Sequence, residues 1–285
     1  MPSTAPVALM HGLWHDGQRH IGAIVQPLQG HAEVALQESD DLVPAARITR
    51  ILSAATRAIG DVTPVSEAMI RDLSVADRER LLLALHIATF GRRQEMVVQC
   101  AACDAQIEVP LDVKALVEAG RGEHEGASAG LDVAIETPLG PIFVRCRPPS
   151  GADQEAAVAQ RDSGAASDTL LLRCIEAVTD SAGARLEPAD MVDLLREPVE
   201  ALLQASDPLT ELRLTIGCPD CGHENLSELD AFQFLKAASI CRGSIFAEVH
   251  RLARAYHWSE ADILAMPLAR RRLYLALLDT EGDQR

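Results

Sequence analysis

The sequence predicts a mixed α+β fold, and three features of its pattern lead to this prediction. Several segments carry apolar residues at the three- and four-residue spacing of amphipathic helices. Other segments are short β-prone runs bounded by turn residues. Two Cys-x-x-Cys turns lie far apart in the chain, and each follows one of these β-prone runs. The mixture of helices and short strands is typical of the α+β class.

Composition narrows the possible functions before any motif is considered. The 285 residues suffice for one large domain or two ordinary ones, and the hydrophobic fraction of 48% supports a real core. The net charge of −16 argues against a nucleic-acid binder, whose affinity comes mainly from lysine and arginine on phosphates, and against adsorption to anionic membranes. No segment has the 18 consecutive apolar residues of a membrane span, and no secretory signal is evident. We therefore expect a cytoplasmic protein.

The first part of the chain is expected to contain one strand followed by helices. Residues Gln18–Pro27 alternate loosely and predict an early strand. The segment Pro44–Ile59 carries an apolar stripe at helical spacing, and Gly60 closes it. Thr63 before Pro64 is typical of an N-cap and a first helical residue.

A second helix start and a series of short strands follow. Ser74 with Asp77 three residues later is close to a capping box, and Gly91 is expected to end that helix. The segment Gly120–Gly130 has the composition of a surface loop. Strands are predicted at Glu95–Cys100, Gln106–Leu111, Val133–Glu136, Ile142–Arg147 and Leu212–Ile216. Helices are predicted at Asp153–Val158, Leu170–Val178, Ala189–Leu203 with an interruption at Pro198, Ile245–His257 and Pro267–Leu278.

The two Cys-x-x-Cys turns predict one structural zinc site. Seven cysteines do not resemble a secreted disulfide framework, so a reducing compartment and metal binding are favoured. Each turn has the spacing of a zinc knuckle, and Gly222 suits the left-handed backbone that such turns need. Two knuckles facing each other make the tetrahedral four-cysteine site of a zinc ribbon. The predicted ligands are Cys100, Cys103, Cys218 and Cys221.

The separation of the two knuckles predicts a domain inserted between them. Between Cys103 and Cys218 lie 114 residues, and closing a flexible loop of that length costs on the order of 4 kcal/mol. A structural zinc site contributes roughly 10–16 kcal/mol, so the zinc outweighs the loop. The expected organisation is an N-terminal segment (1–43), a helical region with the first knuckle (44–111), an inserted α+β domain (112–211), the second knuckle with a helix (212–241) and a C-terminal helical docking segment (242–285).

Other chemistry at these and further residues is less favoured. A redox pair would explain one Cys-x-x-Cys turn but not two with matching surroundings, and two separate disulfides do not suit a reducing compartment. A catalytic zinc needs an open position, so one cysteine would have to be a non-ligand; His223 is a possible but less favoured ligand. We interpret Cys146, Cys174 and Cys241 as small buried hydrophobes. For the histidines near the N-terminus a metal role is disfavoured; they are His11, His15, His20 and His31. No phosphate loop, nucleophile elbow or metalloprotease helix is present, so we expect no enzymatic activity and no small-molecule substrate.

The C-terminal helices differ from the rest in charge. Residues 242–278 hold six arginines and three acidic residues, a net charge of +3, whereas residues 1–241 carry −17. Two interpretations stay open. The helices either pack on their own protein or dock a neighbouring subunit, with Trp258 as an anchor and Arg270, Arg271 and Arg272 at the rim.

Several motifs together resemble one family. They are Leu73–Leu85 with Thr89-Phe90-Gly91, the knuckle Val98-Gln99-Cys100-Ala101-Ala102-Cys103, the run Val144–Glu155 and the second knuckle Cys218–His223. In this order they resemble the baseplate hub proteins of T4-type phages and of contractile injection systems. The terminal segment from Val249 to Glu260 is similar to a motif of small tail-assembly proteins. The resemblance covers most of the chain from about Gln18 to Leu278.

The resemblance implies a structural or assembly component of a phage-tail-like baseplate, with other baseplate or hub subunits as partners. It brings no catalytic residues, and the four cysteines carry over as the zinc site. The alternative is a zinc-ribbon adaptor or regulatory protein unrelated to tails; the charge of −16 disfavours one that binds nucleic acid.

Overall fold

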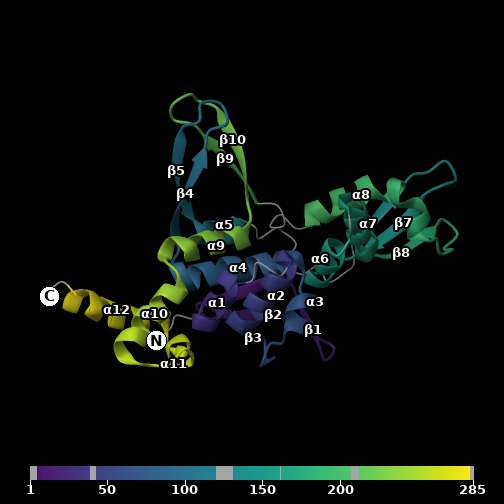
Figure 1. The fold of residues 1–285 in the computed structure, drawn as a ribbon. Coiled ribbons are helices and arrows are strands. Elements are labelled where there is room, and N and C mark those ends of the chain that lie inside the picture. Colours follow the sequence, from purple (N-terminus) through teal and green to yellow (C-terminus); the bar gives the residue numbers. More distant parts are fainter. Residues whose placement is uncertain (1–4, 39–42, 120–130, 161, 207–211, 283–285) are drawn as a thin grey trace.

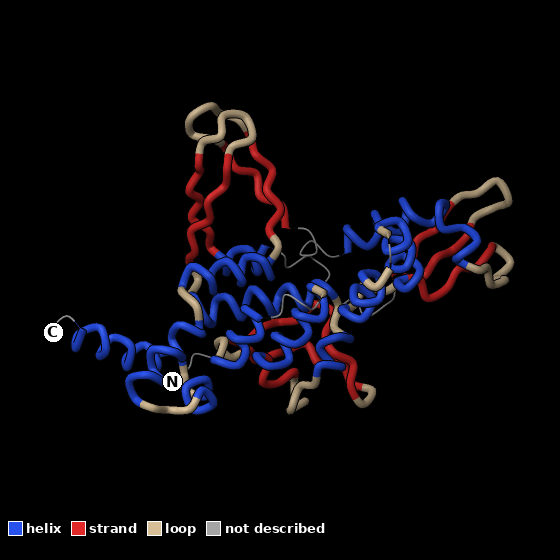
Figure 2. Tube along the Cα trace, in the orientation of Figure 1, coloured by secondary structure: helices blue, strands red, loops and turns tan. Residues whose placement is uncertain are grey.

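The structure is a computed structural model that describes residues 5–38, 43–119, 131–160, 162–206 and 212–282. It confirms a mixed α+β fold with small antiparallel sheets and helices (Figure 2). Figure 1 shows four parts: a central body, a finger of two hairpins, a side domain and a C-terminal module. No helix in these residues is long and apolar enough to cross a membrane.

The central body packs helices against a three-stranded antiparallel sheet. Its strands are β1 (Ala5–His15), β2 (Gln18–Val25) and β3 (Thr56–Ile59), in the order β1-β2-β3. Its helices are α1 (Gly30–Glu38), α2 (Pro44–Ala55), α3 (Glu67–Asp72) and α4 (Val75–Phe90). The central helix α4 packs against β1, α2 and α9, and its leucines are buried in the largest hydrophobic core of the protein.

The predicted start and end of α4 are confirmed. The Ser74 hydroxyl accepts a hydrogen bond from the Asp77 backbone N–H (3.1 Å), and Gly91 ends the helix with φ = 100°. The buried Asp77 carboxylate also accepts backbone N–H bonds from Met10 (2.5 Å), His11 (3.0 Å) and Gly12 (2.8 Å), at the point where the pairing of β1 with β2 shifts register. One carboxylate therefore anchors the irregular part of β1 to the first turn of α4.

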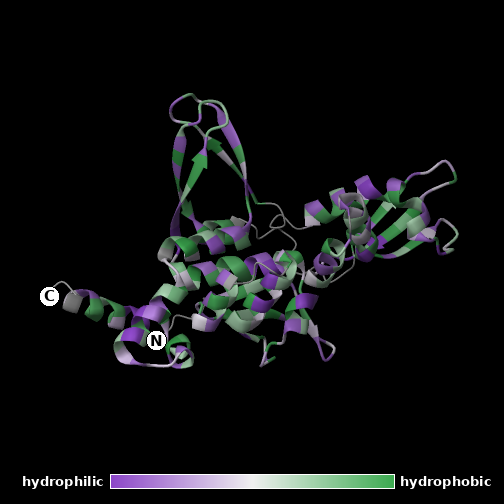
Figure 3. Ribbon diagram, viewed as in Figure 1, coloured by the Kyte–Doolittle hydropathy of each residue, from purple (hydrophilic) through white to green (hydrophobic). Residues whose placement is uncertain are grey.

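The finger consists of two antiparallel hairpins that face each other. The first pairs β4 (Arg93–Gln99) with β5 (Gln106–Asp112), and the second pairs β9 (Leu212–Gly217) with β10 (Glu224–Leu229). Polar and apolar residues alternate along the strands (Figure 3), and the inward residues form a small separate core. At the base of the finger lie α5 (Val113–Ala119) and α9 (Ala231–Arg242), and both contact α4.

The side domain lies between the two hairpins in the chain. It contains the sheet β6 (Leu131–Ile135), β7 (Ile142–Cys146) and β8 (Ile175–Asp180), together with α6 (Gly151–Val158), α7 (Ser163–Cys174), a 3-10 turn (Pro188–Met191) and α8 (Val192–Ser206). Its sheet, α7 and α8 enclose a core of their own. The predicted interruption at Pro198 does not occur, because α8 continues through this residue.

The C-terminal module contains α10 (Ile245–Tyr256), α11 (Glu260–Ala265) and α12 (Leu268–Gly282). These helices enclose a small core around Leu252, Ile263 and Leu275. The module packs on α1, where α10 and α11 both make contacts. A side chain on Gly30 would overlap the Leu264 backbone, with 2.5 Å to its carbonyl oxygen, so α1 and α11 approach closely.

Several other sequence expectations for this fold were wrong or incomplete. The helix expected over Pro44–Ile59 ends at Ala55, because Thr56–Ile59 pairs with β2 as a strand. The first residues of α3 are capped by Ser66 rather than by Thr63. Residues 175–178, expected at the end of a helix, belong to β8, which pairs with β7. Strand β1 was not predicted, and the expected loop at 120–130 lies outside the described residues.

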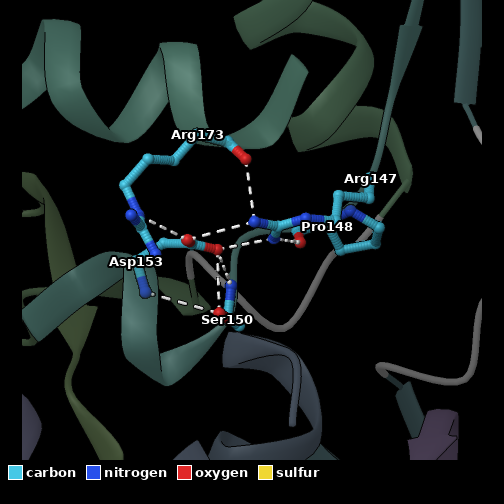
Figure 4. A network of polar contacts seen from close by, with 5 residues as sticks. All are labelled: Arg147, Pro148, Ser150, Asp153 and Arg173. Atoms are coloured by element: carbon cyan, nitrogen blue, oxygen red, sulfur yellow. Dashed lines mark hydrogen bonds and ion pairs between the residues drawn. The ribbon is translucent and has the colours of Figure 1, made fainter. Parts of the chain in front are cut away.

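A network of polar contacts holds together the part of the side domain that adjoins the body (Figure 4). The buried Asp153 carboxylate accepts hydrogen bonds from Arg147 (2.6 and 3.1 Å), at the end of β7, and from Arg173 (2.8 Å). Asp153 and Ser150 form a capping box at the start of α6. The same turn bonds to the body through two backbone hydrogen bonds between residues 149–151 and 73–75 (2.8 and 3.1 Å). Residues 147–153 therefore form a tight joint.

Replacing Gly151 by alanine is expected to loosen this joint. A Cβ at Gly151 would lie 1.5 Å from a guanidinium nitrogen of Arg78. That guanidinium is buried and donates to Thr49 (3.0 Å) and to the Ala45 carbonyl (2.7 Å), so it cannot move without breaking these bonds. We expect a loss of about 2–3 kcal/mol in urea unfolding. Gly22→Ala is the control, since its added Cβ meets nothing within 4 Å; equal stability of the two variants would contradict the prediction.

His86 is expected to make the body sensitive to acid. It is fully buried in α4, stacks on Phe234 of α9 at 4.4 Å, and has no hydrogen-bond partner on either ring nitrogen among the described residues. Burial lowers its pKa from 6.5 to about 4. The unfolded chain therefore takes up a proton between these values while the folded chain does not, so the stability present above pH 6.5 is lost as the pH falls toward 4.

We expect His86 to reduce the unfolding free energy by about 2 kcal/mol between pH 7.5 and pH 5. Other groups titrate in the same range, so the measurement compares urea unfolding of the natural chain and of His86→Leu at both pH values. The leucine variant should lose less stability on acidification. The same loss in both chains would show that His86 is not responsible.

Candidate metal centre

The four predicted cysteines meet at the tip of the finger. Cys100 and Cys103 lie in the β4–β5 turn, Cys218 and Cys221 lie in the β9–β10 turn, and all four sulfur atoms lie within 4.8 Å of one another. The Sγ–Sγ distance is 3.6 Å between Cys100 and Cys221 and 3.7 Å between Cys103 and Cys218. A disulfide requires about 2.05 Å, whereas two sulfurs of a tetrahedral zinc site with Zn–S bonds of about 2.3 Å are about 3.8 Å apart. The observed spacing fits a shared metal ion.

The two turns have the same backbone geometry. The N–H of Cys100 donates to the Ala105 carbonyl and the N–H of Cys218 donates to the His223 carbonyl, both at 2.8 Å. In each turn the residue four positions after the first cysteine donates back to that cysteine's carbonyl at 3.0 Å. Those residues, Asp104 (φ = 60°) and Gly222 (φ = 74°), both have left-handed backbones. The expectation for Gly222 is thereby confirmed, and the matching conformation at Asp104 was not predicted.

The electrostatics of the sulfur cluster favour a cation. Backbone hydrogen bonding from Ala102 lowers the pKa of Cys100 to about 6. At Cys103 the backbone N–H of Ala105 acts in the same direction, but hydrogen bonding to Cys221, desolvation and the other sulfurs outweigh it and raise the pKa to about 12. Four sulfurs this close cannot all become thiolates without a compensating positive charge, and a bound divalent ion supplies that charge. The donor set therefore suits a soft or borderline metal such as zinc.

Asn225 on β10 is a polar residue at this centre that was not predicted. It is buried, and its Oδ1 accepts a hydrogen bond from the Ala101 N–H of the opposite turn at 2.9 Å. Its Nδ2 lies 3.8 Å from the Cys100 sulfur and donates to the Ile216 and His223 carbonyls at 3.3 Å. Asn225 thus links the two hairpins directly. The sequence carries no repeated signal for this role of Asn225, because the equivalent position of the first hairpin is the apolar Ile107.

Replacing Asn225 by leucine is expected to weaken metal binding while leaving the four sulfurs in place. Loss of the outer hydrogen bonds around a metal site typically reduces affinity 10–100-fold. The measurement is competition for zinc with a chromophoric chelator. The control is Glu224→Gln, the exposed preceding residue on β10. If both variants bound zinc equally well, Asn225 would be only a packing residue.

The other predicted site residues lie elsewhere. His223 is exposed and does not belong to the sulfur cluster. Among the described residues, the N-terminal histidines do not come together as a group of three or more potential metal ligands. Trp258 is half-buried in the C-terminal module between Tyr256 and Tyr274, with ring centroids 4.6 and 4.8 Å apart. Arg270 and Arg272 are exposed.

The position predicted for Arg271 was wrong. It was expected at an exposed rim beside Arg270 and Arg272, but it is fully buried. Its guanidinium binds the Glu33 carboxylate of α1 at 2.6 Å and the Glu248 carboxylate of α10 at 3.1 Å. Its position on the inner face of α12 explains the difference, since neighbouring residues on a helix point about 100° apart.

Comparison with known proteins places the chain beside one described family. A family model described as T4 bacteriophage base plate protein matches residues 35–235, which include both hairpins, all four cysteines and the side domain. The matched region excludes β1, β2 and the C-terminal module. Searches among curated proteins and among solved structures found no match.

Proposed function

This chain belongs to the T4 bacteriophage base plate protein family, and on that premise we propose that it is a hub or assembly component of the baseplate of a contractile tail or injection system. The family match over residues 35–235 supports a structural role in a phage baseplate and is the observation on which the proposal depends. The hub position and the injection-system setting go beyond this match and are suggested by the motif order of the sequence.

We further propose that the finger is a zinc ribbon. The sulfur spacing, the matching turns and the need for a compensating charge support a structural Zn²⁺ held by Cys100, Cys103, Cys218 and Cys221. The ion would fix the two hairpins at their tips, where Cys100 and Cys218 are themselves part of the small inner core. Its contribution of roughly 10–16 kcal/mol exceeds the closure cost of about 4 kcal/mol for the intervening 114 residues.

We infer that the chain acts as a scaffold and not as an enzyme. Four thiolates complete a tetrahedral zinc shell and leave no position for a substrate or an activated water. The finger, the side domain and the C-terminal module extend in different directions from the body (Figure 1), as suits a subunit that contacts several neighbours. Other baseplate or hub subunits are therefore the proposed partners.

The test is co-purification of tagged full-length chain expressed with its native gene neighbours, followed by mass spectrometry and cross-linking. We expect baseplate or tail proteins in the purified complex and cross-links from the finger, side domain or C-terminal module. Recovery of the chain alone, with assembled particles lacking it and forming normally in its absence, would contradict the proposed role.

A further inference from the structure

The last helix, α12, carries an apolar stripe that none of the described residues of its own chain covers. Its inner face holds the buried Arg271 and Leu275 with the half-buried Tyr274 and Leu278. On the opposite face Leu273 is 68% exposed and Leu277 is 53% exposed. Among the described residues, no other helix carries two large hydrophobic side chains that are both more than half exposed and one helical turn apart. Isolated exposed leucines are ordinary on a protein surface, whereas a stripe along one helix indicates a contact.

The stripe has the spacing of a helix-pairing seam. Ala269, Leu273, Ala276 and Thr280 are all exposed and follow one another at intervals of four, three and four residues. This is the alternation of d and a positions in a heptad pattern, with Leu277 directly beside the seam. Large and small side chains alternate along it, so a matching helix can interdigitate.

The charges beside the seam change sign along the helix. Arg270 and Arg272 flank its N-terminal half and Asp279 flanks its C-terminal half, and all three are exposed. A uniformly acidic or uniformly basic partner would meet a like charge at one end. A second copy of α12 running antiparallel would place Arg272 opposite Asp279 twice, and would set Leu273 of each copy against Ala276 of the other. In a parallel pair Arg272 would face Leu277 and find no opposite charge.

We propose that two copies of this chain associate through α12, paired antiparallel about a twofold axis. Such an interface is self-complementary, as closed dimers require. Two short helices bury less than a standard interface of about 1,600 Å², so the contact is a weak one with a Kd on the order of 10–100 μM. The inference concerns the chain itself and does not depend on the proposed baseplate role.

Sedimentation of the full-length, zinc-loaded chain under reducing conditions tests the proposal. We expect a reversible monomer–dimer equilibrium when the chain concentration is raised to about 0.3 mM, which is above that Kd. Leu273→Glu should abolish the dimer, and its exposed position makes unfolding an implausible cause. Leu139→Glu is the control, because Leu139 is 99% exposed at the β6–β7 turn. A chain that stays monomeric, or a dimer unaffected by Leu273→Glu, would overturn the proposal.

A charge exchange tests the antiparallel orientation. Arg272→Asp and Asp279→Arg should each weaken the dimer at least tenfold, because each creates two like-charge pairs. The double variant should restore most of the affinity. Asp279 also pairs with Arg251 in the same chain, so circular dichroism must show that the helices remain folded. Failure of the double variant to recover would exclude this pairing of the helices.

Discussion

Serine in place of Cys218 is expected to release the metal and to destabilise the finger. The hydroxyl of serine is a poor substitute for a thiolate, and the binding energy of a structural zinc is also folding energy. The smallest loss of stability that we expect equals the closure cost of the 114-residue segment, about 4 kcal/mol, because the zinc no longer offsets it. A loss of that size would lower the Tm by about 8–16 °C. The measurement is zinc content by elemental analysis, together with thermal unfolding of the same sample.

The matched control is Cys241→Ser. Cys241 was interpreted from the sequence as buried, but it is an exposed cysteine on α9. It lies outside the sulfur cluster, so its replacement should retain one zinc per chain and an unchanged Tm. The interpretation of the cluster as a zinc ligand set fails if Cys218→Ser keeps full zinc and the same Tm. Partial zinc retention with cobalt spectra of a three-thiolate site would still support it, because the remaining sulfurs can hold the ion weakly.

The sequence was most informative where chemistry sets the spacing of residues. The two Cys-x-x-Cys turns predicted a meeting point across 114 residues, and the sulfurs do lie together. Cap residues were equally direct, as at Ser74 and Gly91, because each one satisfies a backbone group only a few residues away. The Asp77 carboxylate instead bonds to the distant backbone of β1. Asn225 and Asp104 escaped prediction because their roles depend on the opposite hairpin or on a turn conformation that aspartate adopts less often than glycine.

Errors in the fold occurred where distant pairing outweighed local preference. Thr56–Ile59 continues an apolar helical stripe, yet β2 offers it a ladder of backbone hydrogen bonds. Ile175–Val178 likewise pairs with β7 rather than extending α7. Neither partner is visible in a window of local sequence. The β-branched residues in both segments fit a strand well, which makes the outcome physically reasonable.

The arginine run shows the same limit for surface predictions. Composition predicts a basic C-terminal segment, but a count of charges does not show which side chain points inward. Arg271 is buried and pairs with two carboxylates, whereas its neighbours Arg270 and Arg272 are exposed. The helices thus pack on α1 of their own chain, and the described residues leave one face of α12 exposed.

Replacing Arg271 by methionine is expected to detach the C-terminal module from the body. The change leaves the Glu33 carboxylate, 8% exposed, without its cation, and removing one partner of a buried ion pair typically costs about 3–5 kcal/mol. Arg272→Met is the matched control, because the same substitution one residue later removes an exposed charge and should change stability by less than about 0.5 kcal/mol. Fluorescence of Trp258 in a Trp14→Phe background reports on the module alone, since the chain has two tryptophans.

A double variant separates loss of the charge pair from loss of packing. Adding Glu33→Gln to Arg271→Met removes the unpaired carboxylate, so a part of the stability should return, and the two effects should not be additive. Glu248 keeps some of the penalty in place, because it is the second carboxylate on the same guanidinium. If Arg271→Met and Arg272→Met unfolded at the same urea concentration, the ion pair would contribute nothing. The close approach of Gly30 to Leu264 would then be what holds the module on α1.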